Sequence, residues 1–494
     1  MNRRVNQNRR EFLCDSARMS AFALAGSALW RIAPALAQTG TVRKLATMTL
    51  AELAHRLSTR QLTSRQLVEE ALAAIRDPRG EGARVFLMVH ESEALAAADR
   101  VDAQRRNGLN PRSLSGIPIS IKDLFDEAGV VTLGGSKVLL GAPPARRDST
   151  VVQRLKKAGA IIIGRTNLTE FAYSGLGINP HYGTPKNTFD RTTGRIPGGS
   201  TSGGAISVTD GMAAAAIGTD TGGSVRIPAA LNGLVGFKPT ARRIPRDGVL
   251  PLSKSLDSVG PIGKSVADCL WLDMVMADEH DVIPLPGRVA GLRFAVPKTV
   301  VQDDLSPSVA NAFAATLSRL SAAGATIIGL PMKEFAQAAE VSPRGALASY
   351  EAYSFHRQWM KEGADKYDPR VMARIRPGEA ISAAKYKQLL RLRKRFIRTI
   401  NAAASGYDAM LMPTTPDTAP TIAEATKDDE SYFRLNSRML RNPSIVNLFD
   451  GCALTIPCHE PGSAPVGLMI AGTQNTDRTI LTIGDAVERI VRQR

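Results

Sequence analysis

Apolar and polar residues recur with two different periods along the chain, which predicts both helices and strands. Leu, Ala and Val return every three or four residues over 50–57 and 65–76, as in amphipathic helices. Thr49 and Ser64 precede these segments as predicted N-caps. Residues 116–123 alternate apolar and polar side chains, and this period of two predicts a strand.

The next segments combine the same elements in an order that indicates the fold class. Asp148 and Ser149 cap a predicted helix that runs to Lys157, Gly159 ends it, and residues 160–163 form a buried apolar strand. The second half of the chain adds predicted strands at 292–296 and 409–412 and predicted helices at 308–323, 383–404 and 478–491. Alternating helices and apolar strands, without a fixed-period repeat, predict an α/β fold in one large domain.

Residues 194–239 differ from their surroundings in composition. They are rich in Gly, Ser, Thr and Ala and carry few long charged side chains. Two glycine-serine clusters, at 197–204 and 218–224, flank a predicted small-residue helix over 205–217. Because small residues let backbones approach closely, this segment is expected to form a tightly packed loop region.

Glycine clusters beside hydroxyl groups indicate either a phosphate-binding loop or a nucleophile with an oxyanion hole. Neither cluster has the Lys that a Walker-type loop requires, and no Gly-x-Gly-x-x-Gly joins a strand to a helix here. The run from Thr221 to Ser224 instead presents a serine beside several backbone N–H groups, as acyl transfer needs. No histidine is near in sequence, so Lys122, at the end of an apolar strand, is the best-placed candidate base.

Taken together, these motifs resemble those of the amidase signature family. The matching runs are residues 121–123, 198–204, 218–228, 233–240, 255–261 and 465–468, and they extend from about residue 50 to the end of the chain. The resemblance implies an α/β fold with a central mixed β-sheet flanked by helices, in a single domain over 38–494.

The resemblance also implies a Ser-cis-Ser-Lys triad. Ser224 matches the nucleophile that forms the acyl-enzyme, Ser200 matches the serine with a cis peptide bond, and Lys122 matches the base. Ser200 and Lys122 are then the proton relay of an amidase that hydrolyses the C–N bond of a carboxylic amide.

Several neighbouring groups are expected to support this triad. Asp220 and Arg226 are expected to hold the nucleophile loop together rather than to touch substrate. The oxyanion hole is expected to be lined by the N–H groups of Thr221, Gly222, Gly223 and Ser224.

One departure from the family pattern concerns the relay serine. The family commonly has Ser-Ser-Gly-Gly where this chain has Ser-Thr-Ser-Gly at 200–203. The spacing to Gly218 and Ser224 favours Ser200 as the relay residue, so Ser202 is expected to be a supporting hydroxyl at most.

The motifs do not select among the family's substrates, which range from small aliphatic and aryl amides to fatty-acid amides, carbamates and glutaminyl groups. Segments 166–182 and 342–386 are expected to shape the pocket, and their aromatic residues are Phe171, Tyr173, Tyr182, Tyr350, Tyr353, Phe355 and Trp359. These rings are compatible with an aryl or arylacetyl amide, and a general resemblance of the second half of the chain to indoleacetamide and mandelamide hydrolases favours the same class. Helix-core packing at three- and four-residue spacing explains the rings at least as well. The alternatives are one subunit of an amidotransferase that works on charged tRNA and a catalytically silent binding protein of the same fold.

Residues 1–37 resemble a twin-arginine export signal. Arg9 and Arg10 precede an apolar stretch over 19–30 and a small-residue cleavage site over 35–37. At twelve residues the apolar stretch is shorter than the ~20 residues that a membrane span needs. Cleavage before Gln38 and a bacterial periplasmic location are therefore expected, with the translocation machinery as a partner and no stable membrane anchor.

The charge and the remaining composition narrow the classes of function. Hydrophobic residues at 44% and charged residues at 22% exclude a disordered, collagen-like or coiled-coil chain. Six Arg and two acidic residues in the signal account for +4 of the net charge of +17. The densest remaining basic run, 385–398, lacks the aromatic interleaving of nucleic-acid readers and is interpreted as a solvated helix face.

Neither cofactor nor metal is expected. The six His are scattered singly, without metal-ligand spacing. Cys14 belongs to the signal; Cys269, Cys452 and Cys458 are interpreted as small buried hydrophobes, and whether the last two pair stays open. The expected partner is a small-molecule amide, without nucleic acid, and a homodimer stays open.

Overall fold

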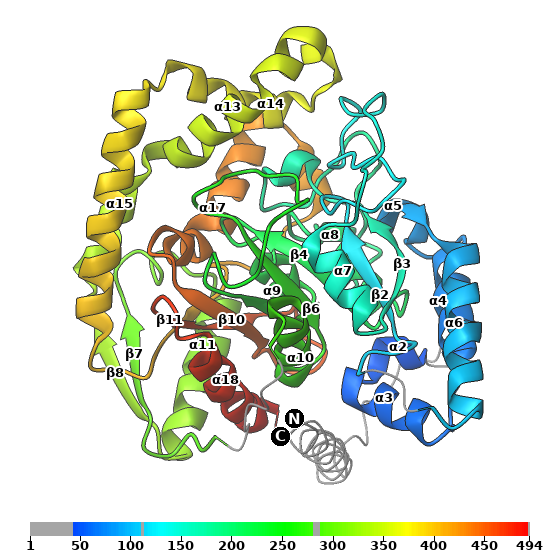
Figure 1. Cartoon of the computed structure of the whole chain (residues 1–494). Helices are drawn as coiled ribbons and strands as arrows, with labels where there is room; N and C mark the ends of the chain where they lie inside the picture. The colour runs from blue at the N-terminus through cyan, green and yellow to red at the C-terminus, as the bar shows by residue number, and fades with distance from the viewer. Residues whose placement is uncertain (1–42, 110–112, 280–286, 493–494) are drawn as a thin grey trace, which may run out of the picture.

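The computed structural model describes residues 43–109, 113–279 and 287–492, which form an α/β fold around one large mixed sheet (Figure 1). The expected signal, residues 1–37, lies outside the described residues. Eleven described strands form the sheet in the order β1-β3-β2-β4-β6-β5-β10-β11-β9-β7-β8. Their bounds are β1 Phe86–Val89, β2 Pro118–Lys122, β3 Ile161–Thr166, β4 Ala215–Asp220, β5 Val235–Lys238, β6 Ser258–Gly263, β7 Arg293–Pro297, β8 Thr326–Leu330, β9 Ala409–Pro413, β10 Cys452–Pro457 and β11 Gly467–Gly472.

Helices surround this sheet, and α15 lies along one outer edge of the molecule while α4 and α6 lie at the opposite edge (Figure 1). In the first half the described helices are α2 Lys44–Thr47, α3 Leu50–Ser58, α4 Ser64–Arg76, α5 Gly82–Val85, α6 Glu91–Arg106, α7 Thr150–Lys157, α8 Ser202–Thr209, α9 Arg226–Leu231 and α10 Val266–Ala277. In the second half they are α11 Pro307–Ala322, α12 Ala338–Val341, α13 Ala346–Gly363, α14 Pro369–Ile375, α15 Ala383–Ala404, α16 Ile422–Thr426, α17 Asp429–Leu448 and α18 Asp477–Arg492. Short 3₁₀ turns are η1 Glu170–Ala172, η2 Lys333–Gln337, η3 Pro343–Gly345, η4 Ala364–Lys366 and η5 Arg376–Ala380.

The sheet is mixed because parallel pairs occur at two places. Strand β2 runs parallel to both β3 and β4, and β7 runs parallel to both β8 and β9. The strands between these groups pair antiparallel, as β4 does with β6 and β10 with β11. The expected α/β fold with a central mixed sheet flanked by helices is confirmed.

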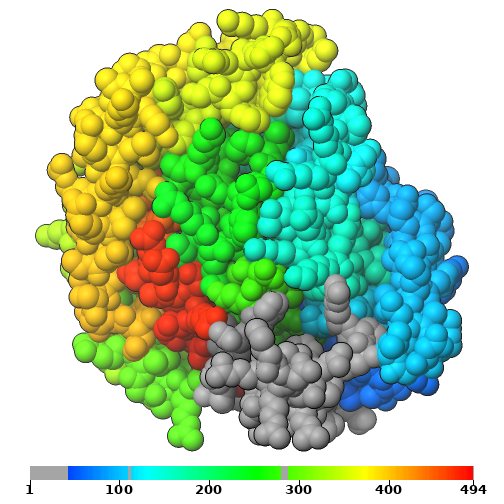
Figure 2. Space-filling view, viewed as in Figure 1, coloured from blue at the N-terminus to red at the C-terminus, as the bar shows by residue number. Residues whose placement is uncertain are grey.

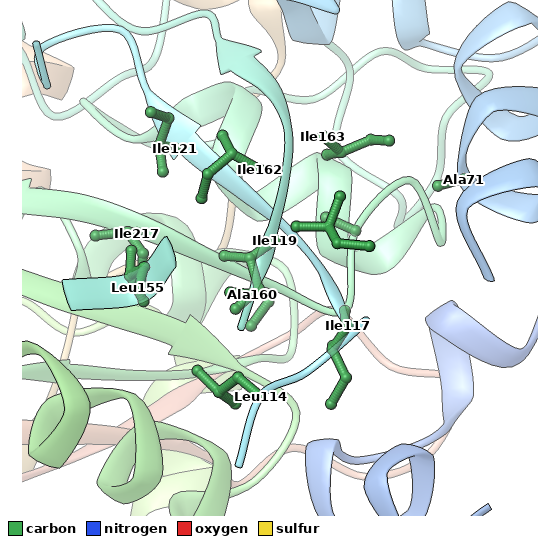
Figure 3. Close-up of a cluster of buried hydrophobic side chains, with 14 of the residues drawn as sticks. Ala71, Leu114, Ile117, Ile119, Ile121, Leu155, Ala160, Ile162, Ile163 and Ile217 are labelled. Carbon is green, nitrogen blue, oxygen red and sulfur yellow. The ribbon is translucent and has the colours of Figure 1, made fainter. Parts of the chain in front are cut away.

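A cluster of branched apolar side chains holds β2 and β3 against the neighbouring helices (Figure 3). Ile119 and Ile121 of β2 are fully buried, as are Ile163 of β3 and Leu155 of α7. Every residue of β2 is buried, so the polar Ser120 needs a partner, and its hydroxyl lies 2.8 Å from that of Ser207 in α8. This packing fixes the strand that carries Lys122.

Most of the sequence-predicted elements are present within a few residues of their predicted bounds. Helix α15 has the predicted bounds, and α3 begins at the predicted cap, Thr49, with a reciprocal capping box. The predicted cap at Ser64 is wrong by one residue. Thr63 caps α4, because its Oγ1 accepts from the N–H of Gln66 while its own N–H donates to Gln66 Oε1.

The predicted helix over 205–217 is wrong in its second half. Helix α8 ends at Thr209, Gly211 has φ +69°, and Ala215 begins β4. Alanine favours helices locally, but here the alanines enter the sheet between β2 and β6. Tertiary pairing thus overrides local propensity, and it brings Thr219 and Asp220 to the end of a central strand.

No described helix combines the length and the apolar character that a membrane span requires.

Candidate active site

Lys122 and Ser200 meet at the carboxyl end of β2. Lys122 Nζ donates to Ser200 Oγ at 2.8 Å and to Thr219 Oγ1 at 3.0 Å, although these residues lie 78 and 97 positions away. Strand β4 pairs parallel with β2 in the register Ile121 to Ile217, so Thr219 follows directly beside the lysine. Sequence reasoning missed Thr219 because it placed the preceding residues in a helix.

The surroundings of Lys122 favour its neutral form. The side chain is fully buried, and this desolvation lowers the pKa of Lys122 from 10.5 to about 7, against the opposing charges of Asp220 and Asp257. A substantial fraction of the amine is therefore unprotonated near neutral pH. A neutral amine can accept a proton from the Ser200 hydroxyl.

The structure places Ser200, not Ser202, beside the lysine. The peptide bond between Gly199 and Ser200 is cis, and the Ser200 carbonyl accepts from Thr169 N–H at 3.2 Å. Ser202 begins α8 and its hydroxyl lies 3.5 Å from the Asn167 carbonyl oxygen. The two serines thus have different partners, and the Lys122 contact belongs to Ser200.

Ser224 lies in the turn between β4 and α9 and is 3% exposed. Its carbonyl oxygen accepts from Thr201 N–H at 3.2 Å, so the two glycine-serine clusters are joined directly through their backbones. Among the described residues, no hydrogen bond joins the hydroxyls of Ser200 and Ser224. The structure therefore brings the predicted triad into one site, with the Lys122–Ser200 contact made.

The predicted oxyanion donors differ in their availability. Gly223 N–H donates to Asp220 Oδ1 at 2.8 Å and is engaged within the loop. The N–H groups of Thr221, Gly222 and Ser224, which lie outside helices and strands, have no hydrogen-bond partner in the described part of the chain. They are the loop donors left for a developing oxyanion. Gly223 has φ +125°, and a Cβ there would lie 2.6 Å from Pro443 Cβ, so only glycine fits.

Asp220 and Arg226 form a buried ion pair that holds this loop. Both side chains are fully buried, and Arg226 donates through Nη2 to Asp220 Oδ1 at 2.9 Å and through Nε to Oδ2 at 3.1 Å. Asn447 Nδ2 adds a bond of 2.9 Å to the same carboxylate. Burial would raise the pKa of Asp220, but the Arg226 guanidinium and these hydrogen bonds hold it well below its ordinary value.

A cavity of about 370 Å³ opens beside Thr219 and Thr221. The cavity is also lined by Leu124, Ala172 and the 246–259 loop, which includes the first two residues of β6. The lining residues of this loop are Arg246, Asp247, Val249, Leu250, Pro251, Leu252, Lys254, Asp257, Ser258 and Val259. In Figure 2 the green part of the chain, which contains this loop, reaches the surface between the cyan and yellow parts. That this loop forms the pocket was not predicted from the sequence. Gly248 and Pro251 could have indicated a loop at this position.

The aromatic side chains that were predicted to line the pocket do not line this cavity. Of the two segments predicted to shape the pocket, only Ala172 contributes to its wall. Phe171 instead packs against His356, with ring centroids 4.4 Å apart, and against Tyr367 at 5.5 Å and Trp359 at 6.4 Å. Phe171 and Tyr173 belong to a buried hydrophobic cluster against which Trp359 packs, which supports the core interpretation for these three rings.

The family of the chain follows from comparison with known proteins. The Amidase family model matches residues 67–481, and the chain belongs to this family. It is therefore an amidase signature hydrolase that acts on C–N bonds.

Several relatives cover nearly the whole chain. It is 35% identical to 2-amino-5-chloromuconic acid deaminase of Comamonas testosteroni, over 90% of this chain and 96% of that protein. It is 34% identical to a glutamyl-tRNA(Gln) amidotransferase subunit from Chloroflexus aggregans, over 88% of this chain and 94% of that protein. A crystal structure of an amidase superposes with a TM-score of 0.80 at 32% identity, over 90% of this chain and 99% of that one.

Proposed function

We propose that this protein hydrolyses a carboxylic amide to the acid and ammonia or an amine, through an acyl-enzyme on Ser224. The observation that carries the proposal is the 2.8 Å contact between Ser200 Oγ and a fully buried Lys122 whose pKa is lowered to about 7. A buried lysine of this kind can serve as a base without histidine.

The proposed reaction moves one proton along this relay. Lys122 accepts the Ser200 proton, Ser200 accepts the Ser224 proton, and Ser224 Oγ attacks the amide carbon. The free N–H groups of the loop, those of Thr221, Gly222 and Ser224, stabilise the oxyanion. When the C–N bond breaks, the proton returns through Ser200 to the leaving nitrogen. Water then repeats the sequence, and its hydroxyl releases the acid from Ser224.

For the substrate we favour an amide with an aryl or arylacetyl group. The cavity supports this choice by its size of about 370 Å³ and by the apolar part of its wall, which includes Leu124, Val249, Leu250 and Leu252. The charged side chains of the wall are those of Arg246, Asp247, Lys254 and Asp257, and they leave room for a polar substituent on the acyl group. The test is a panel of aliphatic, aryl and arylacetyl amides, assayed with the wild type and with Ser224→Ala. Turnover of none of them by the wild type, or equal turnover by the variant, would contradict the proposal.

Export to the periplasm is proposed from the sequence alone. It depends on Arg9 and Arg10 followed by the apolar stretch and the cleavage site. Replacing both arginines with lysine should retain the protein in the cytoplasmic fraction of the cell that makes it. Unchanged fractionation of the variant would remove the twin-arginine route.

A further inference from the structure

Asp257 is a buried carboxylate next to the nucleophile loop that the proposed relay does not use. It directly precedes β6 and is 7% exposed. Its Oδ1 accepts a short hydrogen bond from Thr221 Oγ1, and its Oδ2 accepts from the N–H groups of Leu252 and Ser253, both at 3.0 Å. The carboxylate thus joins the loop that carries Ser224 to the loop that lines the cavity.

Further hydrogen bonds hold the 246–259 loop, which lines the cavity, in place. Arg246 Nη1 donates to the carbonyl oxygen of Asp257 at 3.0 Å. Glu351 of α13 accepts from Ser255 N–H at 3.1 Å and from the hydroxyl of Ser253. Since these contacts hold the 246–259 loop against a helix, Asp257 provides a fixed acceptor for the hydroxyl of Thr221.

Asp257 also acts on Lys122 through its charge. Two carboxylates, Asp220 and Asp257, favour the protonated form of Lys122. The charge of Asp220 is neutralised by its ion pair with Arg226. Among the described residues no salt bridge reaches the carboxylate of Asp257, and Arg246 contacts only its backbone oxygen. Burial raises the pKa of Asp257 to about 6, against the Thr221 hydrogen bond and the charge of Arg246, so the carboxylate is ionised at and above neutral pH. Without a direct ion pair, Asp257 is the less compensated of the two charges.

We propose that Asp257 is a positioning residue for the hydrolysis: it orients the Ser224 loop through Thr221, and its charge stabilises the lysinium that forms when Lys122 accepts the relay proton. The inference rests on the proposed function. It adds to that function a carboxylate that acts through two other groups and does not itself touch the reacting atoms.

The test measures the rate at which a fluorophosphonate probe labels the protein, as a function of pH, so no natural substrate is needed. Removing the charge in Asp257→Asn should slow labelling by about tenfold or more and move the rising limb of the rate to lower pH, because the neutral amine becomes easier to form. Thr221→Val should slow labelling about as much without moving the limb, since the charge remains. Thr221→Ser, which retains the hydroxyl that bonds Asp257, should recover most of the labelling rate lost in Thr221→Val.

Asp268→Asn is the matched control, because Asp268 is another buried carboxylate that accepts backbone N–H groups, from Leu50 at 2.8 Å and Lys264 at 3.0 Å, outside the cavity. It should leave both rate and pH limb unchanged. A slowed Asp257→Asn with an unmoved limb, or Thr221→Val labelling at the wild-type rate, would overturn the inference. If Asp257→Asn does not fold, Thr221→Val alone decides. Labelling of Ser224→Ala at the wild-type rate would instead refute the proposed function, whatever the Asp257 variants do.

Discussion

Lys122 Nζ lies 2.8 Å from Ser200 Oγ, with both side chains fully buried. The contact joins the end of a central strand to the first of the two glycine-serine clusters. Its burial is as important as its length, because removal from water makes the lysine a weaker base that can release its proton again.

Ser224→Ala should fold and lose at least about 10⁴-fold in kcat/KM, because the nucleophile of a covalent mechanism has no substitute. Steady-state assays with the most active amide of the panel, together with circular dichroism, measure both effects. Mass spectrometry of the probe-treated wild type provides the control, since the adduct must lie on Ser224. An adduct on another residue would contradict the assignment.

Substitution of the two serines considered for the relay, Ser200 and Ser202, should affect activity to different extents. Ser200→Ala should lose most of the activity because it removes the acceptor of the Lys122 contact. Ser202→Ala should stay within about tenfold of the wild type, since its hydroxyl makes only a 3.5 Å contact with the Asn167 carbonyl. The measurement is kcat/KM for both variants on one amide. The reverse order would assign the relay to Ser202.

Activity should rise with pH and level off above about 7, because the relay needs neutral Lys122 and its pKa is lowered to about 7. The pH dependence of kcat/KM measures this limb in the free enzyme. Lys122→Met should be nearly inactive, and its remaining activity should no longer rise with pH in this range. Wild-type activity that is constant from pH 5 to 9 would exclude the lysine as the base.

The same burial should cost stability at low pH. Between a folded pKa of about 7 and an unfolded value of 10.5, the unfolded chain binds more protons, so stability rises with pH through this window. Lys122→Met removes the buried amine and should melt at a higher temperature than the wild type, with a difference that grows as the pH falls from 10 towards 7. Calorimetry at several pH values tests this. A constant or reversed difference would contradict the prediction.

Breaking the Asp220–Arg226 pair should strongly destabilise the protein. Arg226→Met leaves a fully buried carboxylate uncompensated and should cost about 3–5 kcal/mol of unfolding free energy. The double variant Asp220→Asn with Arg226→Met should recover part of this loss, because it removes the stranded charge. Urea unfolding measures both. If the double variant were less stable than the single one by the full cost of a second independent loss, the pair would not be coupled.

The strongly periodic elements could be predicted from local sequence, and so could the chemistry that we propose for the site. The helix at 383–404 and the strand before Lys122 follow from local periodicity, and the glycine-serine runs indicate a serine nucleophile because few other sites need hydroxyls amid so many small residues. What failed was the alanine-rich run before Thr219, whose local preference for helix is overruled by pairing with β2 and β6.

Which of these groups come into contact depends on the folded arrangement of distant segments. The parallel register of β2 and β4 sets Thr219 beside Lys122, and the junction at Asp257 couples residues 36 positions apart. Such contacts depend on sheet pairing between distant segments, and the burial that lowers the pKa of Lys122 depends on everything packed around it. Residue types and spacing therefore indicate the reaction, whereas proton affinity and the shape of the cavity are properties of the folded chain.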